Sequence, residues 1–200
     1  MLGWSKTEKE LYALGHRLIA GVDEAGRGPI AGPVVAAAVV LDPWTPVELL
    51  EDSKKLSPSK RQEASVLIRR HARAWSVGMV GAAEIDKMNI RKASLAAMAM
   101  ALERLAVQPD YVLIDGTEVP SGNVLSRSVV KGDAHVACIA AASILAKVFR
   151  DDLMRWYDRI YPGYGLAQHK GYATPQHLDA IHRLGLSPLH RTTFRVAVAG

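Results

Sequence analysis

Gly21-Val22-Asp23-Glu24-Ala25-Gly26-Arg27-Gly28-Pro29-Ile30-Ala31-Gly32-Pro33 is the stretch that decides how this chain folds. It follows a short apolar run, Leu18 to Val22, which predicts a strand ending at about Asp23. Two adjacent carboxylates therefore stand where the strand ends, and a glycine-rich turn follows at once. Successive strand side chains point to opposite faces, so both acids can share one site only if the chain bends there. The glycines make such a bend possible.

Three interpretations of this stretch can be weighed, and the first does not fit. The glycines suggest a phosphate-binding loop, but neither the P-loop spacing nor the dinucleotide-binding spacing is present, and a bare carboxylate pair would repel a phosphate. A divalent cation removes that conflict, because Asp23 and Glu24 could hold the metal while the metal holds phosphate oxygens. The third interpretation is an ordinary solvated acidic turn.

Composition limits the class of protein. Two hundred residues with 49% hydrophobic content fit one globular domain, and a net charge of +5 is compatible with a nucleic-acid partner. Cys138 is the single cysteine, which excludes an intramolecular disulfide and favours a reducing compartment. The N-terminus lacks the apolar core of a signal peptide, and the longest apolar runs are too short to span a membrane. We expect a soluble, cytoplasmic protein that acts as a monomer, without a membrane partner.

Apolar runs and helix signals alternate along the chain. A capping box, Ser5-x-x-Glu8, opens a short helix that we expect to pack Leu11 and Leu14. Apolar runs predict five strands, at about Leu18–Asp23, Val34–Leu41, Ala74–Val80, Tyr111–Ile114 and Ser126–Val130. Caps and helical spacing predict helices over Pro58–His71, Glu84–Ala106, Ala134–Ile160 and from Pro175 to a stop at Gly185. This order implies a mixed sheet flanked by helices, with a small C-terminal helical extension.

A second acid repeats the opening pattern. The apolar run Tyr111 to Ile114 ends in Asp115, and a glycine follows. Ligand sites of open α/β sheets lie beyond the carboxyl ends of strands, so Asp23 and Asp115 should converge if their strands are neighbours. Asp133 precedes the long helix, and two roles stay open for it: another acid of the site, or an N-cap that bonds the Ala134–Val136 amides.

Two further acids, Asp151 and Asp152, cannot share a metal with Asp133. In a continuous helix with a rise of about 1.5 Å per residue, Asp151 lies roughly 27 Å from Asp133. They are expected to pair with basic residues on the helix surface, namely Lys147, Arg150 or Arg155.

Oxygen ligands at strand ends favour Mg²⁺ or Mn²⁺ over zinc. Four of the seven histidines follow residue 168, which leaves a zinc site as an alternative. However, His177 and His182 are five residues apart and do not face one another on a helix, and a lone cysteine adds nothing to a zinc site.

Seven blocks between residue 21 and about residue 195 together closely resemble bacterial ribonuclease HII and stand in the order of that family. The combination is far more specific than any single motif. The chain departs from the family pattern at Ala137-Cys138, where small or proline residues are expected, and in the tail after Phe194. The blocks are Gly21 to Pro33, Asp52-Ser53-Lys54-Lys55-Leu56-Ser57, Ile114-Asp115-Gly116, Lys131-Gly132-Asp133-Ala134, Ile139 to Val148, His169-Lys170-Gly171-Tyr172 and His190-Arg191-Thr192-Thr193-Phe194.

This resemblance implies an α/β, RNase H-like fold: a mixed five-stranded sheet flanked by helices, with residues 1–160 as the catalytic domain and residues 161–200 as a helical extension packed on it. It implies hydrolysis of the RNA strand of RNA–DNA hybrids and incision 5′ of single ribonucleotides in duplex DNA. Two-metal catalysis would leave a 3′ hydroxyl and a 5′ phosphate. The family's catalytic, metal-binding acids carry over onto Asp23, Glu24, Asp115 and Asp133, with Mg²⁺ or Mn²⁺ as the cofactor.

The resemblance also implies how substrate is recognised. The family's Gly-Arg-Gly element falls on Gly26, Arg27 and Gly28, whose backbone can approach the 2′ hydroxyl that distinguishes RNA from DNA. Its substrate-sensing tyrosine falls on Tyr172, whose ring could stack on a neighbouring sugar. The remaining contacts are expected to be lysines that meet phosphates, namely Lys54, Lys55, Lys147 and Lys170.

Two other functions remain to be separated from this one. Another two-metal nuclease of the same fold, such as a junction resolvase or DNA integrase, would explain the acids but leaves Gly26, Arg27, Gly28 and Tyr172 without a role. A hybrid-binding module without activity would not need four acids where metal chemistry needs them. A metal-dependent cleavage assay separates all three.

Overall fold

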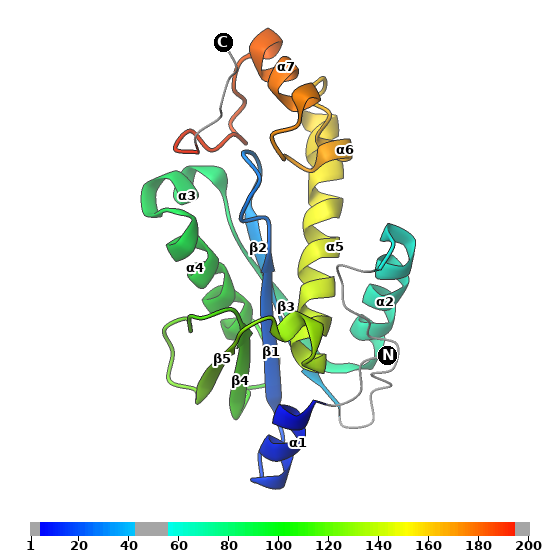
Figure 1. The fold of residues 1–200 in the computed structure, drawn as a ribbon, viewed down its shortest axis with the longest axis vertical. Helices are drawn as coiled ribbons and strands as arrows, with labels where there is room; N and C mark the ends of the chain where they lie inside the picture. The colour runs from blue at the N-terminus through cyan, green and yellow to red at the C-terminus, as the bar shows by residue number, and fades with distance from the viewer. Residues whose placement is uncertain (1–4, 43–55, 195–200) are drawn as a thin grey trace.

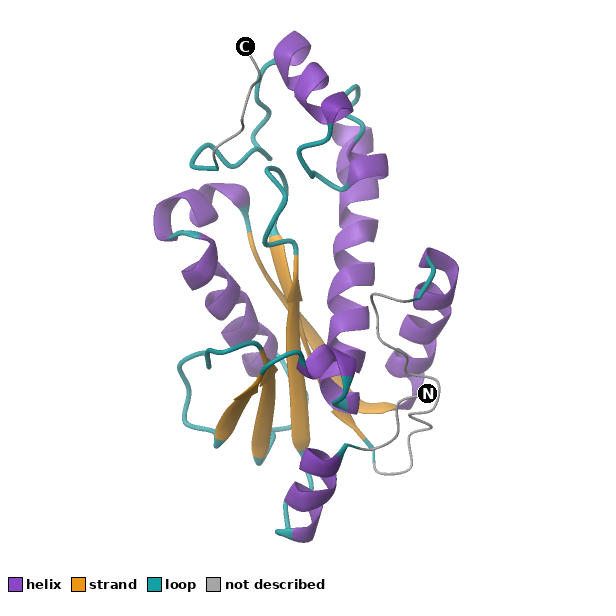
Figure 2. Cartoon of the chain, viewed as in Figure 1, coloured by secondary structure: helices purple, strands orange, loops and turns teal. Residues whose placement is uncertain are grey.

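The computed structural model describes residues 5–42 and 56–194. Five strands form one sheet in the order β3-β2-β1-β4-β5. The pairs β1–β2 and β2–β3 are antiparallel, whereas β1–β4 and β4–β5 are parallel. The predicted mixed five-stranded sheet is therefore confirmed (Figure 2). The strands are β1 (Ile19–Ala25), β2 (Val34–Leu41), β3 (Ala72–Val80), β4 (Tyr111–Asp115) and β5 (Ser126–Val129).

Helices cover both faces of the sheet. The long helix α5 and the helix α2 lie on one face, and α4 lies on the other; α6 and α7 lie at the far end of α5 (Figure 1). No helix within the described ranges is long and apolar enough to cross a membrane. The helices are α1 (Lys6–Ala13), α2 (Pro58–His71), α3 (Ala82–Met88), α4 (Ile90–Glu103), the 3₁₀ turn η2 (Gly132–Ala134), α5 (Ala137–Ile160), α6 (Leu166–His169) and α7 (Pro175–Leu184).

The single helix predicted over Glu84–Ala106 is wrong, because the chain forms two helices there. Asn89 separates them with a positive φ of 70°, and its side chain accepts a hydrogen bond from the Lys92 N–H at 3.1 Å. Asparagine tolerates a positive φ better than most residues and caps helices well. One residue therefore ends α3 and begins α4.

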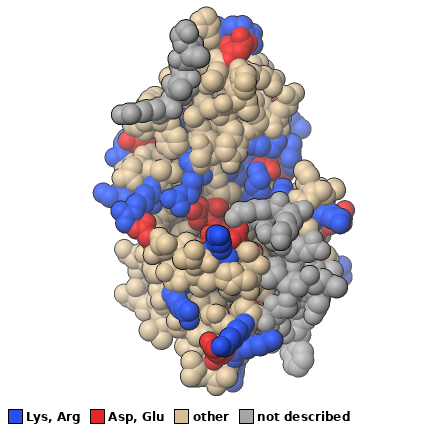
Figure 3. Space-filling model, in the orientation of Figure 1, with Lys and Arg blue, Asp and Glu red and all other residues tan. Residues whose placement is uncertain are grey.

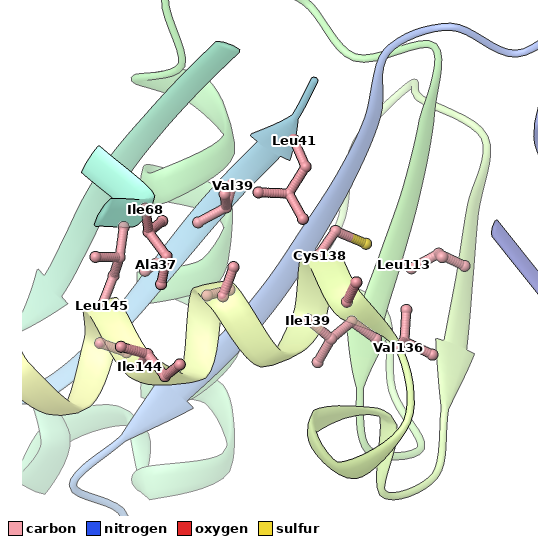
Figure 4. Close-up of a cluster of buried hydrophobic side chains, with 14 of the residues drawn as sticks. Ala37, Val39, Leu41, Ile68, Leu113, Val136, Cys138, Ile139, Ile144 and Leu145 are labelled. Carbon is pink, nitrogen blue, oxygen red and sulfur yellow. The ribbon is translucent and has the colours of Figure 1, made fainter. Parts of the chain in front are cut away.

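The packing of α5 on β1 brings the helix backbone unusually close to the sheet. A Cβ atom at Gly21 would lie 2.1 Å from the backbone carbonyl carbon of Cys138, so no side chain fits at Gly21. Around this contact, the apolar core between α5, α2 and the sheet is built from small and branched side chains, including Val39, Ile68 and Ile144 (Figure 4). The close contact fixes α5 beside the strand that carries Asp23.

The N-terminal helix caps the long helix. The predicted capping box of Ser5 and Glu8 is confirmed, and Leu11 is buried, but Leu14 is 77% exposed, so its predicted packing is wrong. The Glu8 side chain is fully buried, and its carboxylate accepts hydrogen bonds from the N–H groups of Ala137 and Cys138 at 3.2 and 2.9 Å. The first amides of α5 thus bond a carboxylate 129 residues earlier in the chain.

The capping role considered for Asp133 is consequently wrong. The amides of Ala134, His135 and Val136 donate instead to the backbone carbonyls of Lys131 and Gly132. Asp133 lies in η2, before the helix begins, and is 2% exposed.

Candidate active site

Two acids lie on neighbouring parallel strands. Val22 of β1 pairs with Ile114 of β4, and each is followed by an aspartate, Asp23 and Asp115. The strands are therefore neighbours, which is the condition under which these two acids were expected to converge. The backbone N–H of Asp133 donates to Oδ1 of Asp115 at 3.3 Å, so the third aspartate adjoins the second.

The predicted strand end at about Asp23 is wrong, because β1 continues to Ala25. The bend considered necessary for Asp23 and Glu24 to share one site is therefore not needed. Asp23 and Glu24 remain paired with Ala37 and Ala36 of β2. On its other side, no described strand pairs with β1 beyond Val22, since β4 ends at Asp115. The side chain of Glu24 lines a pocket on the α5 side and a smaller one on the α4 side, so it reaches the site past this free edge.

All four acids line one pocket of about 350 Å³. Its walls come from β1, β4, η2, α5 and the segment after α6, which are far apart in sequence. Acidic side chains gather near the middle of the face drawn in Figure 3, with basic side chains on both sides of them. The lining residues are Asp23, Glu24, Ala25, Gly26, Arg61, Asp115, Asp133, Ser143, Lys147, Arg150 and Tyr172.

Burial and crowding raise the pKa of both adjacent acids. Burial, and then the charge of Glu24, raise the pKa of Asp23 well above its ordinary value, while a hydrogen bond from Ser143 opposes the shift. Burial also raises the pKa of Glu24, although Arg27 opposes it with an Nη1–Oε1 contact of 3.0 Å. The charge of Asp115 adds to both shifts. A bound cation would relieve this repulsion.

The donor set suits a hard cation, because carboxylate oxygens are the ligands that Mg²⁺ and Mn²⁺ prefer. In the part of the chain that the structure describes, however, no three His, Cys, Asp or Glu side chains converge as a ready metal site. Glu24 is held by Arg27, and Asp115 accepts from the Asp133 N–H. The acids are thus separate carboxylates lining one pocket, and they would have to turn toward one another to hold one metal ion together.

Tyr172 lines the same pocket and is 49% exposed. Gly28 lies beside its ring, and Gly26 lines the pocket floor. The Arg27 side chain is exposed and pairs with Glu24. The structure therefore brings the predicted Gly-Arg-Gly element and the predicted tyrosine to the acids.

The four predicted lysines differ in position. Lys147 lines the pocket and pairs with Asp151 through an Nζ–Oδ1 contact of 2.6 Å, as predicted for that acid. Lys170 folds back, with Nζ donating to the carbonyl of Ala167. Lys54 and Lys55 lie outside the described residues.

Sequence reasoning missed two buried arginines. Arg150 was expected as a surface partner of an acid, yet it is 1% exposed and bonds backbone carbonyls, while Arg155 pairs with Asp152 as expected. Arg191, 2% exposed, received no role at all. Ser143 and Arg61 at the pocket were also missed. For Arg191 and Ser143 the only signal was their membership of the blocks quoted above.

Three of the late histidines form a stack rather than a zinc site. The rings of His169 and His177 are 4.2 Å apart, and Nε2 of His177 lies 3.1 Å from Nε2 of His190. Nδ1 of His177 bonds the backbone carbonyl of Tyr172 at 2.9 Å. These nitrogens are occupied by each other and by the backbone, so the stack supports the segment that carries Tyr172.

A second pocket of about 360 Å³ lies between α4 and the connection from β4 to β5. Its lining is mainly apolar, with Glu103 as its one ionisable side chain. The pocket lined by the four acids is therefore the better candidate for an active site.

Comparison with known proteins finds a family and solved structures that are similar to this chain. A model of the family "Ribonuclease HII" matches residues 20–197. Ribonuclease HII of Moorella thermoacetica is 52% identical over 188 residues, which are 94% of this chain and 91% of that protein. The crystal structure of ribonuclease H2 from Pyrococcus horikoshii has a TM-score of 0.76 at 27% identity, covering 88% of this chain and 93% of that one. Bst-RNase HIII in complex with Mn²⁺ has a TM-score of 0.73 at 18% identity, covering 94% and 70%. The predicted RNase H-like fold is confirmed.

Proposed function

The chain belongs to the ribonuclease HII family of metal-dependent ribonucleases, and on that premise we propose that it hydrolyses the RNA strand of RNA–DNA hybrids and incises 5′ of single ribonucleotides in duplex DNA. One observation carries the proposal: Asp23, Glu24, Asp115 and Asp133 line one pocket with Tyr172 and Gly26. The acids offer the chemistry, and the other two residues offer contacts to a sugar.

In the proposed mechanism, the four carboxylates hold Mg²⁺ or Mn²⁺. Two such ions would supply an activated water and charge stabilisation at the leaving 3′ oxygen, giving a 3′ hydroxyl and a 5′ phosphate. Asp23 and Asp115 project from paired strands, so their backbone positions are fixed before substrate arrives. In this proposal the Glu24 side chain leaves Arg27 and turns toward the metal site. The guanidinium group of Arg27 is then free to bind a phosphate or a sugar.

In the proposed recognition, the backbone of Gly26, Arg27 and Gly28 reads the 2′ hydroxyl, the group that marks a ribonucleotide. Tyr172 stacks on the neighbouring sugar, because its half-exposed ring borders the same pocket. Phosphates along the duplex meet Lys147, Lys170 and, on the sequence resemblance alone, Lys54 and Lys55. Such contacts release counterions, so binding should weaken steeply as salt rises.

We also propose the compartment in which the enzyme acts, its oligomeric state and its domain bounds. The excess of basic residues suits a duplex substrate, and a single cysteine buried in the core suits a reducing cytoplasm. We propose that the chain acts as a monomer in removing ribonucleotides from DNA, with residues 1–160 as the catalytic domain and 161–200 as an extension packed on it.

The test is cleavage of three duplexes that share one sequence. The first is all DNA, the second has one ribonucleotide, and the third pairs an RNA strand with DNA. We expect metal-dependent cleavage of the second and third only, with the cut in the second 5′ of the ribonucleotide. Cleavage of the all-DNA duplex would favour a resolvase-type nuclease, and binding without cleavage would favour a module without activity.

A further inference from the structure

Arg191 holds the Gly-Arg-Gly element through three backbone carbonyls. Its Nη2 donates to the carbonyl of Gly26 at 2.6 Å, Nη1 to that of Arg27 at 3.0 Å, and Nε to that of Gly32 at 3.0 Å. Arg191 thus bonds a loop that precedes it by more than 150 residues. Every nitrogen of the guanidinium group contacts that loop.

Arg150 makes a second set of bonds to the same loop. Its Nε donates to the carbonyl of Pro33 at 3.0 Å and Nη2 to that of Ala31 at 3.1 Å, while Nη1 donates to the carbonyl of Lys170 at 3.0 Å. The carbonyl of Gly171 also accepts from the N–H of Ile30 at 2.9 Å. The loop and the segment that carries Tyr172 are therefore joined in one unit.

These two buried cations are costly features. Both are almost completely buried, and among the described residues neither forms an ion pair with a carboxylate. Burial and the neighbouring Arg150 lower the pKa of Arg191 to about 9. Arg191 also lies over the ring of Phe194, 4.9 Å from its centroid. A buried guanidinium group whose hydrogen bonds all go to carbonyls contributes little net stability compared with apolar packing. What it fixes is the direction of the carbonyl groups.

That direction has a consequence for the amides. In a trans peptide the C=O and N–H bonds point in opposite directions, and the chain has no cis peptide within the described residues. Because the carbonyls of Gly26 and Arg27 point to Arg191, the N–H groups of Arg27 and Gly28 point away from it. In the described part of the chain neither N–H donates a hydrogen bond. They remain available to an acceptor outside.

We propose that Arg191, supported by Arg150, is a positioning residue for ribonucleotide recognition: it orients the Arg27 and Gly28 amides toward the 2′ oxygen of the substrate. This rests on the proposed function, since it explains how the recognition element of that site is set. Neither arginine needs to touch substrate. The expected defect of an Arg191 variant is loss of discrimination, beyond any loss of stability.

Discrimination is measured as an affinity ratio. Binding of a duplex with one ribonucleotide is compared with binding of the same duplex made only of DNA, in Mg²⁺ and in an Asp115→Asn background that prevents turnover. Arg191→Lys keeps the charge but loses the planar donor array. The matched control is Leu166→Ala. Leu166 is fully buried in an apolar cluster with Met154 and Leu189, and its side chain bonds none of these carbonyls.

We expect the ratio to fall at least about tenfold in Arg191→Lys, the size expected for one or two lost hydrogen bonds. Leu166→Ala should keep the ratio within about twofold at a similar loss of melting temperature. Equal ratios in the two variants would overturn the inference. Failure of the chain with native Arg191 to discriminate would instead overturn the proposed function, and the inference with it.

A second measurement keeps the inference testable if Arg191→Lys folds poorly. In Arg191→Ala, millimolar guanidinium ion should restore part of the discrimination ratio by occupying the vacated site. Sodium chloride at the same ionic strength should not restore it. Equal effects of the two salts would count against a positioning role.

Discussion

The ring of Tyr172 lies beside the backbone of Gly28: a methyl group added to Gly28 would stand 3.5 Å from Cε1 of Tyr172. That is an ordinary van der Waals distance, and among the described residues, its chain neighbours apart, the added methyl group would have no other atom within 4 Å. The gap between the two residues is therefore about one methyl group wide. In the proposed complex, a methyl group added there would stand where the substrate approaches the Gly28 backbone and the Tyr172 ring.

Gly28→Ala should consequently impair recognition without impairing folding. We expect the melting temperature to stay within a few degrees, and cleavage at a lone ribonucleotide to fall at least about tenfold, as for a misplaced substrate. Gly122→Ala is the neutral control, because its Cβ would meet no described atom within 4 Å and Gly122 lines the apolar pocket and not the pocket of the acids. Gly26→Ala should behave differently and destabilise the fold, because its Cβ would lie 2.0 Å from Nε of Arg150. Melting curves with single-turnover rates distinguish these cases.

Tyr172→Ala should reduce cleavage at a single ribonucleotide through loss of the stacking surface. Aromatic stacking on a nucleotide is worth roughly 1–3 kcal/mol, or about tenfold to a hundredfold and more. Tyr172→Phe keeps the ring, so its cleavage rate should lie between that of Tyr172→Ala and that of the parent protein. Trp156→Ala, an exposed aromatic of similar accessibility on α5, should leave the rate unchanged. A large shift in the metal concentration for half-maximal rate, with binding unaltered, would contradict the role given to Tyr172.

Asp115→Asn should abolish turnover and leave binding of the hybrid largely intact. A neutral amide cannot replace carboxylate charge toward Mg²⁺. The fold should survive, because the charge of Asp115 raises the pKa of both Asp23 and Glu24, and its removal relieves repulsion. The control is Asp152→Asn, which breaks only an exposed pair with Arg155. Near-normal turnover of Asp115→Asn in saturating Mg²⁺ would remove this residue from the site.

Glu8→Ala should destabilise the protein by about 2–4 kcal/mol. The change leaves the buried amides of Ala137 and Cys138 without an acceptor and removes a negative charge from the N-terminus of α5. Glu10→Ala removes an exposed acid of the same helix, paired with Lys6 at 3.8 Å, and should cost little. Urea unfolding of both variants at neutral pH makes the comparison, and equal midpoints would disprove the capping role.

Acid should weaken the fold through His177. Burial lowers the pKa of His177 from 6.5 to about 4, with the charges of His169 and His190 adding to the shift and the Tyr172 carbonyl opposing it. The unfolded chain takes up this proton near pH 6.5, whereas the folded chain does so near pH 4. Stability is therefore complete above pH 6.5 and falls as the pH drops toward 4, by up to about 3 kcal/mol.

The measurement for His177 is urea unfolding at pH 7.5 and pH 4.5. His177→Asn should be less stable than the parent at pH 7.5 but should lose less stability on acidification. His182→Asn is the control, since it replaces an outward-lying histidine of the same helix. Parallel pH profiles of the parent and His177→Asn would show that another group causes the acid sensitivity.

Local patterns were enough to predict the strands and most of the helices. The run Val34–Leu41 became a strand with all eight residues buried, and Ser57 and Thr174 cap their helices as expected. The prediction of one helix over Glu84–Ala106 was wrong at Asn89, because a single residue with a positive φ does not change the spacing of apolar residues. The first strand was also predicted to end too early, at about Asp23, because pairing with β2 keeps β1 extended beyond that residue.

The pocket was predictable only in part. Asp23 and Asp115 could be expected together because parallel strands end at one edge, which is a rule of sheet topology. The roles of Arg150, Arg191 and Glu8 depend on contacts between segments more than 100 residues apart, such as Arg191 with Gly26. Charged residues are mostly exposed in proteins, so a sequence pattern places them at the surface. No neighbouring residues indicate that one of them bonds a distant backbone.

The cap that Glu8 provides for α5 also constrains the order of events during synthesis. During translation Glu8 leaves the ribosome before α5, and the amides of Ala137 and Cys138 follow 129 and 130 residues later. At typical translation rates of about 5–20 residues per second, that delay is on the order of 10 s. During that delay the carboxylate of Glu8 has no helix to cap. It therefore stays solvated until the first residues of α5 have been synthesised.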